Sequence, residues 1–576
     1  PCRSRPMRRQ FLLRTGKCVS DLYPRVMSAP PPPVPRTVVT KNRDALLDLK
    51  GAFSSKCFFS RGPGTLRVAE NLHAEVRKKV VEQITKACED AGVSASGIAL
   101  FRGGREQCRN DTDHELLFRQ ESYFQYLFGV EDPDWWGMLE LPSGRSTLFT
   151  PRLDEAYAIW MGELKSPQHY QEHYGADAVC YVDEMQSCLA SALQGEGLLH
   201  AMAGTNTDSG EDISKVLPVV EAVPEGAKIH TDILFTVIAD ARVTKTAAEL
   251  EVMQYASWVT SVAHVEVMRD VTPGMMEYQL EARFKYHMAE QGGSRHCAYT
   301  CICACGPNAA VLHYGHAGAP NDWQLKESDM ALLDMGAEYH CYCSDITCSY
   351  PVSGRFTDDQ RLIYGAVLDA QRHVISTIRA GVKWPEMHRL AWRTVLTHLR
   401  DGGVLTGHVD DMLAAGLGAT FNPAGLGHLI GLDTHDVGGY LKMNPQRIAE
   451  PGISKLRTAR VLEAGMCLTV EPGCYFIDCL IEQALADPAK SKFIVMEVLD
   501  RFRRFGGVRL EDVVVVTESG VENYTLCPRT VEEVESVMAG GQWPPTEDAA
   551  PWLYRKWATL DRRSGRMALQ TVKTEA

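Results

Sequence analysis

The chain lacks long hydrophobic runs and an excess of positive charge. None of its segments approaches the 18 or more consecutive apolar residues that mark a membrane-spanning helix, so we expect no membrane partner. The formal net charge is −13 at pH 7, with 60 Lys and Arg against 73 Asp and Glu. This sign disfavours nucleic acid as a partner and fits an enzyme better.

A recognisable secretory signal is also missing, which affects how the 18 cysteines are interpreted. Disulfides are typical of secreted chains, so cysteines in a chain without such a signal indicate a reducing compartment. The rest of the composition is ordinary, with 45% hydrophobic and 23% charged residues. A chain of 576 residues is long enough for two domains with large cores and additional tails.

The first 61 residues differ in composition from the remainder. Up to Lys41 there are nine basic residues and a single acid, Asp21. Three interpretations remain open: a mitochondrial transit peptide, a translated region upstream of a start at Met7 or Met27, and a disordered tail. We expect no folded structure before about Gly62. We predict a cytoplasmic location, or a mitochondrial one if the leader is a transit peptide.

Two aspartates occur in a predicted β-hairpin. Apolar runs around Asp334 and Asp345 flank a polar centre at 338–340. If the turn is centred between Tyr339 and His340, the aspartates are cross-strand partners with Cβ atoms roughly 5 Å apart, which metal ions can bridge. Either aspartate alone would be explained equally well by an edge position, but a facing pair is harder to explain in that way.

Three further candidate ligands follow along the chain. His428 lies in a glycine-flanked segment, although a single histidine is most often structural. Glu471 ends an apolar run just before Pro-Gly, so a strand would carry this carboxylate at its tip. Glu511 lies inside an apolar strand predicted over 508–516, where burial of an unpaired ion would cost several kcal/mol.

Four carboxylates in one place carry about −4 charges and would stay partly protonated at neutral pH unless cations were bound. Two divalent ions would cancel that charge. One imidazole and four carboxylates form an oxygen-rich site that suits Mn²⁺. The metal is not fixed by these residue types, because Zn²⁺ and Co²⁺ bind such ligands at least as tightly.

The five residues in this order and spacing resemble the proline-specific metallopeptidases of the pita-bread fold, and most closely the prolidase family. The resemblance spans roughly residues 62–540 and includes Phe118–Ser122, Tyr299–Asp322, Ser344–Cys348, His435–Tyr440, Leu456–Arg460 and Phe505–Arg509. It implies an α+β fold, in which a pita-bread (creatinase/aminopeptidase) catalytic domain follows a creatinase-type α/β amino-terminal domain.

Four segments are predicted from this resemblance and from the local patterns. They are a basic, proline-rich leader at 1–61, the amino-terminal domain at 62–233, a dinuclear-metal catalytic domain at 234–540 and a loosely ordered tail at 541–576. Tryptophans in the tail could still pack it down. The expected helices are His73–Gly92, Thr246–Val271 and Asp358–Ala380, and the expected strands include Gly97–Phe101 and Trp136–Leu141.

The resemblance also implies a role for each site residue. Two divalent ions per subunit, preferably Mn²⁺, would be held by Asp334, Asp345, His428, Glu471 and Glu511, with Asp345 and Glu511 bridging them. A hydroxide between the ions would attack the peptide carbonyl. Glu471 would shuttle protons, and His313 and His435 would contact the substrate and stabilise the developing charge. Arg457 would bind the free carboxylate of a C-terminal proline.

The implied activity is metal-dependent hydrolysis of dipeptides with C-terminal proline by a homodimer. One alternative is an aminopeptidase P-like enzyme acting on longer peptides, against which Arg457 argues. Another is a catalytically impaired binding protein, because Ala424 stands where the family usually has a histidine. Trp160 matches a tryptophan that reaches the neighbouring subunit's active site in the family's dimers, but it could equally pack in the core.

Overall fold

The computed structural model describes residues 57–193, 197–216, 218–219, 222–315 and 320–574. Most of the predicted leader therefore lies outside the described residues. The part within them is folded, because Phe58 and Phe59 are buried and Phe59 forms a β-bridge with Val68. Folded structure thus begins before Gly62, earlier than expected. In the described part of the chain, no helix has the length and apolar character needed to cross a membrane.

The first folded region is built on a mixed six-stranded sheet with the order β4-β3-β2-β1-β5-β6. Its strands are β1 (Gly97–Arg102), β2 (Trp136–Leu141), β3 (Ser146–Thr150), β4 (Ala178–Tyr181), β5 (Leu198–His200) and β6 (Lys228–His230). Its helices are α2 (Leu72–Asp90), α3 (Ser122–Phe128), α4 (Ala158–Met161), α5 (Pro167–Tyr174), α6 (Met185–Ala192), α7 (Ile213–Val216) and α8 (Leu234–Ala241). The helix expected from His73 and the two expected strands are confirmed.

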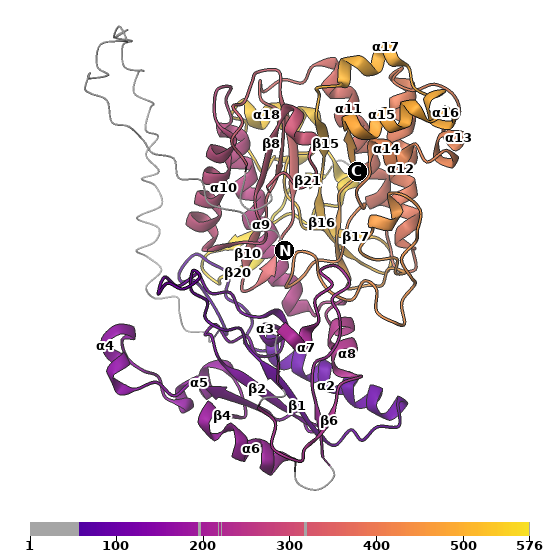
Figure 1. The fold of residues 1–576 in the computed structure, drawn as a ribbon. Helices are drawn as coiled ribbons and strands as arrows, with labels where there is room; N and C mark the ends of the chain where they lie inside the picture. The colour runs from indigo at the N-terminus through magenta and orange to yellow at the C-terminus, as the bar shows by residue number, and fades with distance from the viewer. Residues whose placement is uncertain (1–56, 194–196, 217, 220–221, 316–319, 575–576) are drawn as a thin grey trace, which may run out of the picture. The chain divides into compact units, whose positions relative to one another are not determined.

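The second region contains long helices on both sides of short antiparallel sheets (Figure 1). Its helices are α9 (Ala247–Asp270), α10 (Glu277–Gly292), α11 (Asp358–Thr377), α12 (Trp384–Asp401), α13 (Val409–Ala414), α14 (Gly418–Phe421), α15 (Asp478–Ala486), α16 (Pro488–Ser491), α17 (Met496–Leu499) and α18 (Val531–Met538). Capping boxes begin α9 at Thr246 and α11 at Thr357, close to the expected helix starts.

Four small sheets carry the candidate site. Three have the orders β12-β9-β8, β11-β10-β7 and β13-β16-β17, and the fourth pairs β14 with β15. The strands are β7 (His296–Cys297), β8 (Ile302–Cys305), β9 (Met330–Asp334), β10 (Ala337–Tyr339), β11 (Tyr342–Cys343), β12 (Thr347–Pro351), β13 (Cys467–Val470), β14 (Gly473–Tyr475), β15 (Gly507–Arg509), β16 (Asp512–Val516) and β17 (Val521–Asn523).

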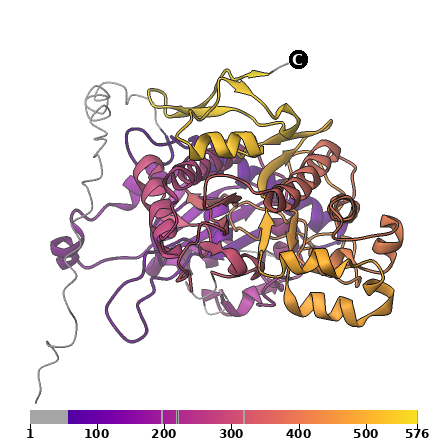
Figure 2. The same cartoon turned by 90° about the horizontal axis from the view of Figure 1, so that it is seen from above.

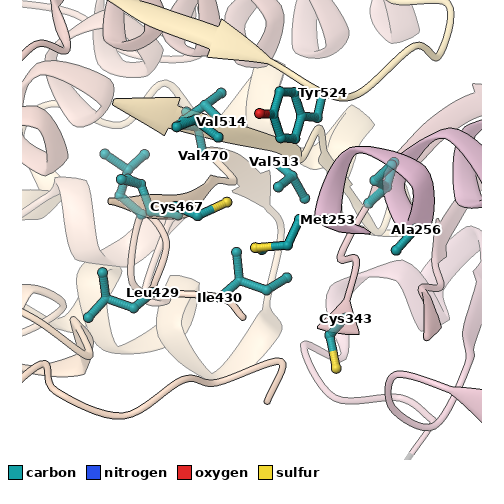
Figure 3. Close-up of a cluster of buried hydrophobic side chains, with 14 of the residues drawn as sticks. Met253, Ala256, Cys343, Leu429, Ile430, Cys467, Val470, Val513, Val514 and Tyr524 are labelled. Atoms are coloured by element: carbon teal, nitrogen blue, oxygen red, sulfur yellow. The ribbon is translucent and has the colours of Figure 1, made fainter. Parts of the chain in front are cut away.

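A continuous hydrophobic core joins α9 to these sheets. Figure 3 draws Met253 of α9 close to Ile430 and to Val513 of β16, and all three side chains are almost fully buried. Removing such side chains from water stabilises the fold by about 1.5–3 kcal/mol each. The core therefore fixes the strands whose ends carry the candidate ligands.

The C-terminal segment is not loosely ordered in the described residues up to 574, so that expectation was wrong. It forms β18 (Glu547–Asp548), β19 (Ala558–Asp561), β20 (Arg566–Leu569) and β21 (Lys573–Thr574), of which β19 and β20 contact α9. Figure 2 shows these strands in yellow along one edge of the view. Trp557 is buried and donates to Asp548 Oδ2 at 2.8 Å, while Trp543 donates to the Leu526 carbonyl at 2.7 Å. Tryptophans therefore pack the segment down, because each buries an apolar ring and satisfies its N–H.

Candidate metal centre and active site

The hairpin that carries the two aspartates forms in a different register from the expected one. Tyr339 pairs with Tyr342, and the two turn residues between them, His340 and Cys341, have φ of 50° and 64°. A two-residue turn with both φ values positive is favoured in hairpins because it matches the twist of the strands. The turn is centred between His340 and Cys341, one position later than predicted. Asp334 consequently faces Thr347 rather than Asp345.

Asp345 lies instead in the irregular segment between β11 and β12. One ligand atom each from Asp345, His428 and Glu511 lies within 4.8 Å of the other two, and all three residues are buried. His428 Nε2 is 3.4 Å from Asp345 Oδ2 and 3.6 Å from Glu471 Oε1. Four of the five predicted ligands therefore converge around the His428 ring.

Two neighbouring strands break at the same level to place the glutamates. The predicted strand over 508–516 is interrupted at 510–511, so Glu511 lies between β15 and β16 and not inside one strand. The antiparallel segment paired with it is interrupted in the same way at Glu471, which follows β13 as expected and precedes β14. Because Val470 pairs with Asp512 and Gly473 with Arg509, both glutamates lie at this shared break.

A glycine lets the His428 segment approach β13. Gly427 has a φ of 157°, and a Cβ there would lie 2.1 Å from the Thr469 carbonyl oxygen. The His428 amide donates to Thr469 Oγ1 at 3.1 Å, and the Leu429 backbone bridges to Leu468. This close approach brings the imidazole to the end of the strand that carries Glu471.

Asp334 lies beside this group and is held by two donors. Tyr299 donates its hydroxyl to Asp334 Oδ1 at 2.5 Å, and Arg509 donates to Oδ2 at 2.6 Å. Thr347 donates its hydroxyl to Glu511 Oε2 at 2.7 Å. None of these three donors was predicted from the sequence to belong to the site. Arg509 could have been found, because a cation in an apolar strand two residues before Glu511 needs an anionic partner.

Burial and crowding of carboxylates shift the pKa values of the site. Burial, with neighbouring carboxylates adding to it, raises the pKa of Glu471 to about 7 and that of Glu511 well above its usual range. Burial also raises the pKa of Asp334 to about 6. For Asp345 the effect of burial is outweighed by the hydrogen-bonded His428, which lowers the pKa.

The residues fit a divalent cation. Asp345 Oδ1 and Glu511 Oε1 are buried without a hydrogen-bond partner among the described residues, which is costly for carboxylate oxygens. A bound cation would satisfy both oxygens and would offset the repulsion that raises these pKa values. One imidazole and carboxylate oxygens are suitable ligands for such an ion.

The predicted substrate-binding residues line the same cavity, which has a volume of about 1020 Å³. His313, His435, Arg457 and all five candidate ligands contribute to its wall, and so does Ala424. The His435 ring is perpendicular to that of His428, with centroids 4.5 Å apart. Burial, with the cations of His428 and Arg457, lowers the pKa of His435 to about 2, so this imidazole is neutral at neutral pH.

A buried ion network holds the loop that carries His435. Asp436 accepts from Arg242 at 2.6 Å and from Lys245 at 3.0 Å, and all three side chains are almost fully buried. Asp433 accepts from the same Arg242 at 2.8 Å. The loop is therefore fixed from both sides of His435 by residues of the segment between α8 and α9.

Comparison with known proteins agrees with this architecture. The model of metallopeptidase family M24 matches residues 251–518, and the model of the aminopeptidase P N-terminal domain matches residues 73–200. These matches confirm the expected order along the chain, in which a creatinase-type amino-terminal domain is followed by a pita-bread catalytic domain.

Curated relatives and solved structures give the same result. The chain is 51% identical to the Xaa-Pro dipeptidase of Rattus norvegicus and 50% identical to that of Homo sapiens, in each case over 84% of the chain and 96% of the relative. It is 32% identical to aminopeptidase PepP of Pseudomonas aeruginosa, with a TM-score of 0.66 over 83% of the chain and 99% of that structure. The chain therefore belongs to metallopeptidase family M24, in its prolidase branch.

Proposed function

We propose that this protein is a metal-dependent Xaa-Pro dipeptidase, which hydrolyses dipeptides with C-terminal proline. The observation that carries this proposal is the meeting of buried candidate metal ligands, two of them with unpartnered oxygens, and Arg457 in one cavity. Its curated relatives with this activity are about half identical to it over most of their length.

The site takes divalent metal, and we propose two Mn²⁺ ions held by Asp334, Asp345, His428, Glu471 and Glu511. When bound, such ions supply Lewis acidity, which lowers the pKa of water and polarises a peptide carbonyl. Asp345 and Glu511 would be ligands in this set, because each has a buried oxygen without a hydrogen-bond partner among the described residues in addition to the oxygen that faces a neighbour.

The chain's own residues would complete the reaction. Glu471 has the more exposed carboxylate, with 17% of its side chain accessible against 7% for Asp345, so it can exchange a proton with substrate. Neutral His435 can donate a hydrogen bond to the oxygen on which charge develops. Arg457 can bind the carboxylate of the proline. The proline nitrogen of an Xaa-Pro bond carries no hydrogen, so the enzyme needs no group to accept a hydrogen bond from it.

The test is hydrolysis of Gly-Pro, Ala-Pro and Ala-Pro-Ala by the purified protein with and without Mn²⁺, together with metal content per chain. Cleavage of both dipeptides and not of the tripeptide, in the presence of metal only, is the expected result. Cleavage of the tripeptide would indicate an aminopeptidase P-like enzyme. Absence of cleavage with metal bound would indicate the binding-protein alternative.

Ala424 lines the cavity at the position where a histidine is expected. We predict that Ala424→His raises kcat/KM for Ala-Pro about tenfold, because an added imidazole would supply one more donor to the developing charge. Ala424→Leu is the control, since it adds bulk without a donor and is expected to lower kcat/KM. Unchanged kcat and KM in Ala424→His would contradict a role for this position.

We also propose that the protein is a homodimer. Trp160 is 83% exposed and Ile159 is 79% exposed, so the core-packing interpretation of Trp160 is wrong and an apolar surface remains on α4. Such a surface favours contact with another chain. Sedimentation equilibrium should give about twice the chain mass of 63.9 kDa.

A cytoplasmic location is likewise proposed, supported by 16 described cysteines that are free thiols.

A further inference from the structure

A carboxylate from the amino-terminal region reaches the wall of the active-site cavity. Asp208 Oδ1 lies 3.3 Å from Arg457 Nη1 and 3.6 Å from Arg447 Nη2, and all three residues line the cavity. The Asp208 side chain is only 17% exposed, so its charge is partly desolvated. Neither metal binding nor the proposed chemistry of Glu471 and His435 requires this contact.

The position of Asp208 is fixed by its own loop. Asn206 Oδ1 accepts from the backbone amides of Asp208 at 2.9 Å and of Ser209 at 3.2 Å. The ends of the loop are joined by a β-bridge between Thr205 and Asp212. The carboxylate is therefore presented to the cavity by a closed turn.

Arg447 is already held by other partners. It donates to the carbonyls of Ser454, at 3.1 Å, and Leu456, at 2.5 Å, and its guanidinium lies 4.3 Å from the centre of the Tyr440 ring. Arg457 differs, because Asp208 is the only carboxylate within ion-pair distance of it among the described residues. Asp208 is therefore the group that can orient the Arg457 side chain.

The contact leaves Arg457 able to bind a second anion. Charge-assisted hydrogen bonds are about 2.7–2.9 Å long, so 3.3 Å is a loose ion pair through one Nη atom. A guanidinium has five N–H donors, and the Arg457 side chain is 28% exposed in the cavity wall. The two arginines and Asp208 together carry a net charge of +1, which one substrate carboxylate would neutralise.

We propose, building on the proposed function, that Asp208 is a specificity-determining residue that holds Arg457 in position to receive the carboxylate of a dipeptide. Without Asp208, Arg457 loses its anchor, and binding of a carboxylate must also order a long side chain. A peptide with a residue after the proline places no carboxylate there and gains nothing from this arrangement. The preference for a free C-terminus then depends on Asp208 as well as on Arg457.

The experiment compares Ala-Pro with Ala-Pro amide, which lacks the carboxylate, in the metal-loaded enzyme. In Asp208→Asn the KM for Ala-Pro is expected to rise about tenfold with kcat within about twofold, because ground-state binding is weakened. The kcat/KM for the amide is expected to stay unchanged, so the preference for the free acid falls about tenfold. Asp208→Glu should recover part of this preference.

Glu211→Gln is the matched control, since Glu211 is an exposed acid in the same loop, and it should behave as wild type. A lower KM for Ala-Pro in Asp208→Asn would mean that Asp208 competes with substrate, and equal losses for both substrates would indicate a purely structural role. Either result overturns the inference and leaves the proposed function intact. Failure of the wild type to cleave Ala-Pro would instead overturn the proposed function, and the inference with it.

Discussion

Replacing Glu511 with glutamine is expected to lower kcat/KM for Ala-Pro at least about 1000-fold, equal to about 4 kcal/mol of transition-state stabilisation. Glu511 is 1% exposed, and its Oε1 has no hydrogen-bond partner among the described residues. Glutamine keeps the size of the side chain and an oxygen that can accept from Thr347, but it removes the charge that would bind metal. Metal content per chain should fall together with activity.

The same substitution should stabilise the metal-free protein at neutral pH. Burial, together with the charges of Asp345 and Glu471, raises the pKa of Glu511 well above its ordinary value of 4.5. Below pH 4.5 the carboxyl is protonated in both the folded and the unfolded state, so it costs nothing. As pH rises, the unfolded state ionises freely and the folded state does not, so the free energy of unfolding falls. Glutamine does not ionise, so Glu511→Gln avoids this fall in the free energy of unfolding.

Thermal melting of metal-free and metal-loaded samples measures both effects. Metal-free Glu511→Gln is expected to have a higher Tm than metal-free wild type, and added Mn²⁺ should raise its Tm less than it raises that of wild type. Glu522→Gln is the control, because Glu522 on β17 forms a half-exposed ion pair with Lys556, away from the candidate metal ligands. Full metal binding and activity in Glu511→Gln would refute the assignment of Glu511 as a ligand.

The elements that hold the site could largely be predicted from the sequence. The helices expected from Thr246 and Asp358 begin within one residue of those positions, and the position of Glu471 followed from an apolar run that ends before Pro-Gly. These signals are local, since each depends on residues within a few positions. That the five candidate residues bind metal stays a prediction.

The register of the hairpin could not be predicted in the same way. A polar centre at 338–340 located the turn to within one position, but which two residues adopt positive φ depends on the packing around them. That one position decides whether Asp334 faces Asp345 or Thr347. The break at 510–511 was missed for a similar reason, because an apolar pattern does not reveal that a strand leaves one sheet and enters another.

Contacts between distant segments were also beyond the sequence pattern. Asp208 meets Arg457 across 249 positions of the chain, and Arg242 meets Asp436 across 194. In the sequence, nothing near Asp208 distinguishes it from other acidic residues in loops. Only the fold brings Asp208 to the cavity, so its contact with Arg457 could not be predicted from the sequence.

Metal uptake by the metal-free protein is expected to tighten steeply between about pH 6 and pH 8. Burial raises the pKa of Asp334 to about 6 and that of Glu471 to about 7, and it raises that of Glu511 well above its ordinary value. The metal-free site therefore retains protons near neutral pH, and these must leave when the carboxylates bind metal. Lower pH favours the protonated carboxyls and so weakens metal binding.

The expected magnitude follows from the number of protons displaced. Each proton released on binding changes the affinity about tenfold per pH unit, so two protons would change it up to about 10⁴-fold across this range. Competition with a chelator of known affinity measures the Mn²⁺ affinity at each pH, and calorimetry in buffers of different ionisation enthalpy counts the protons. Glu511→Gln should release about one proton fewer, because glutamine has none to give. An affinity that does not change over this range would mean that the carboxyls are already ionised in the metal-free protein, held so by the neighbouring cations Arg509 and His428.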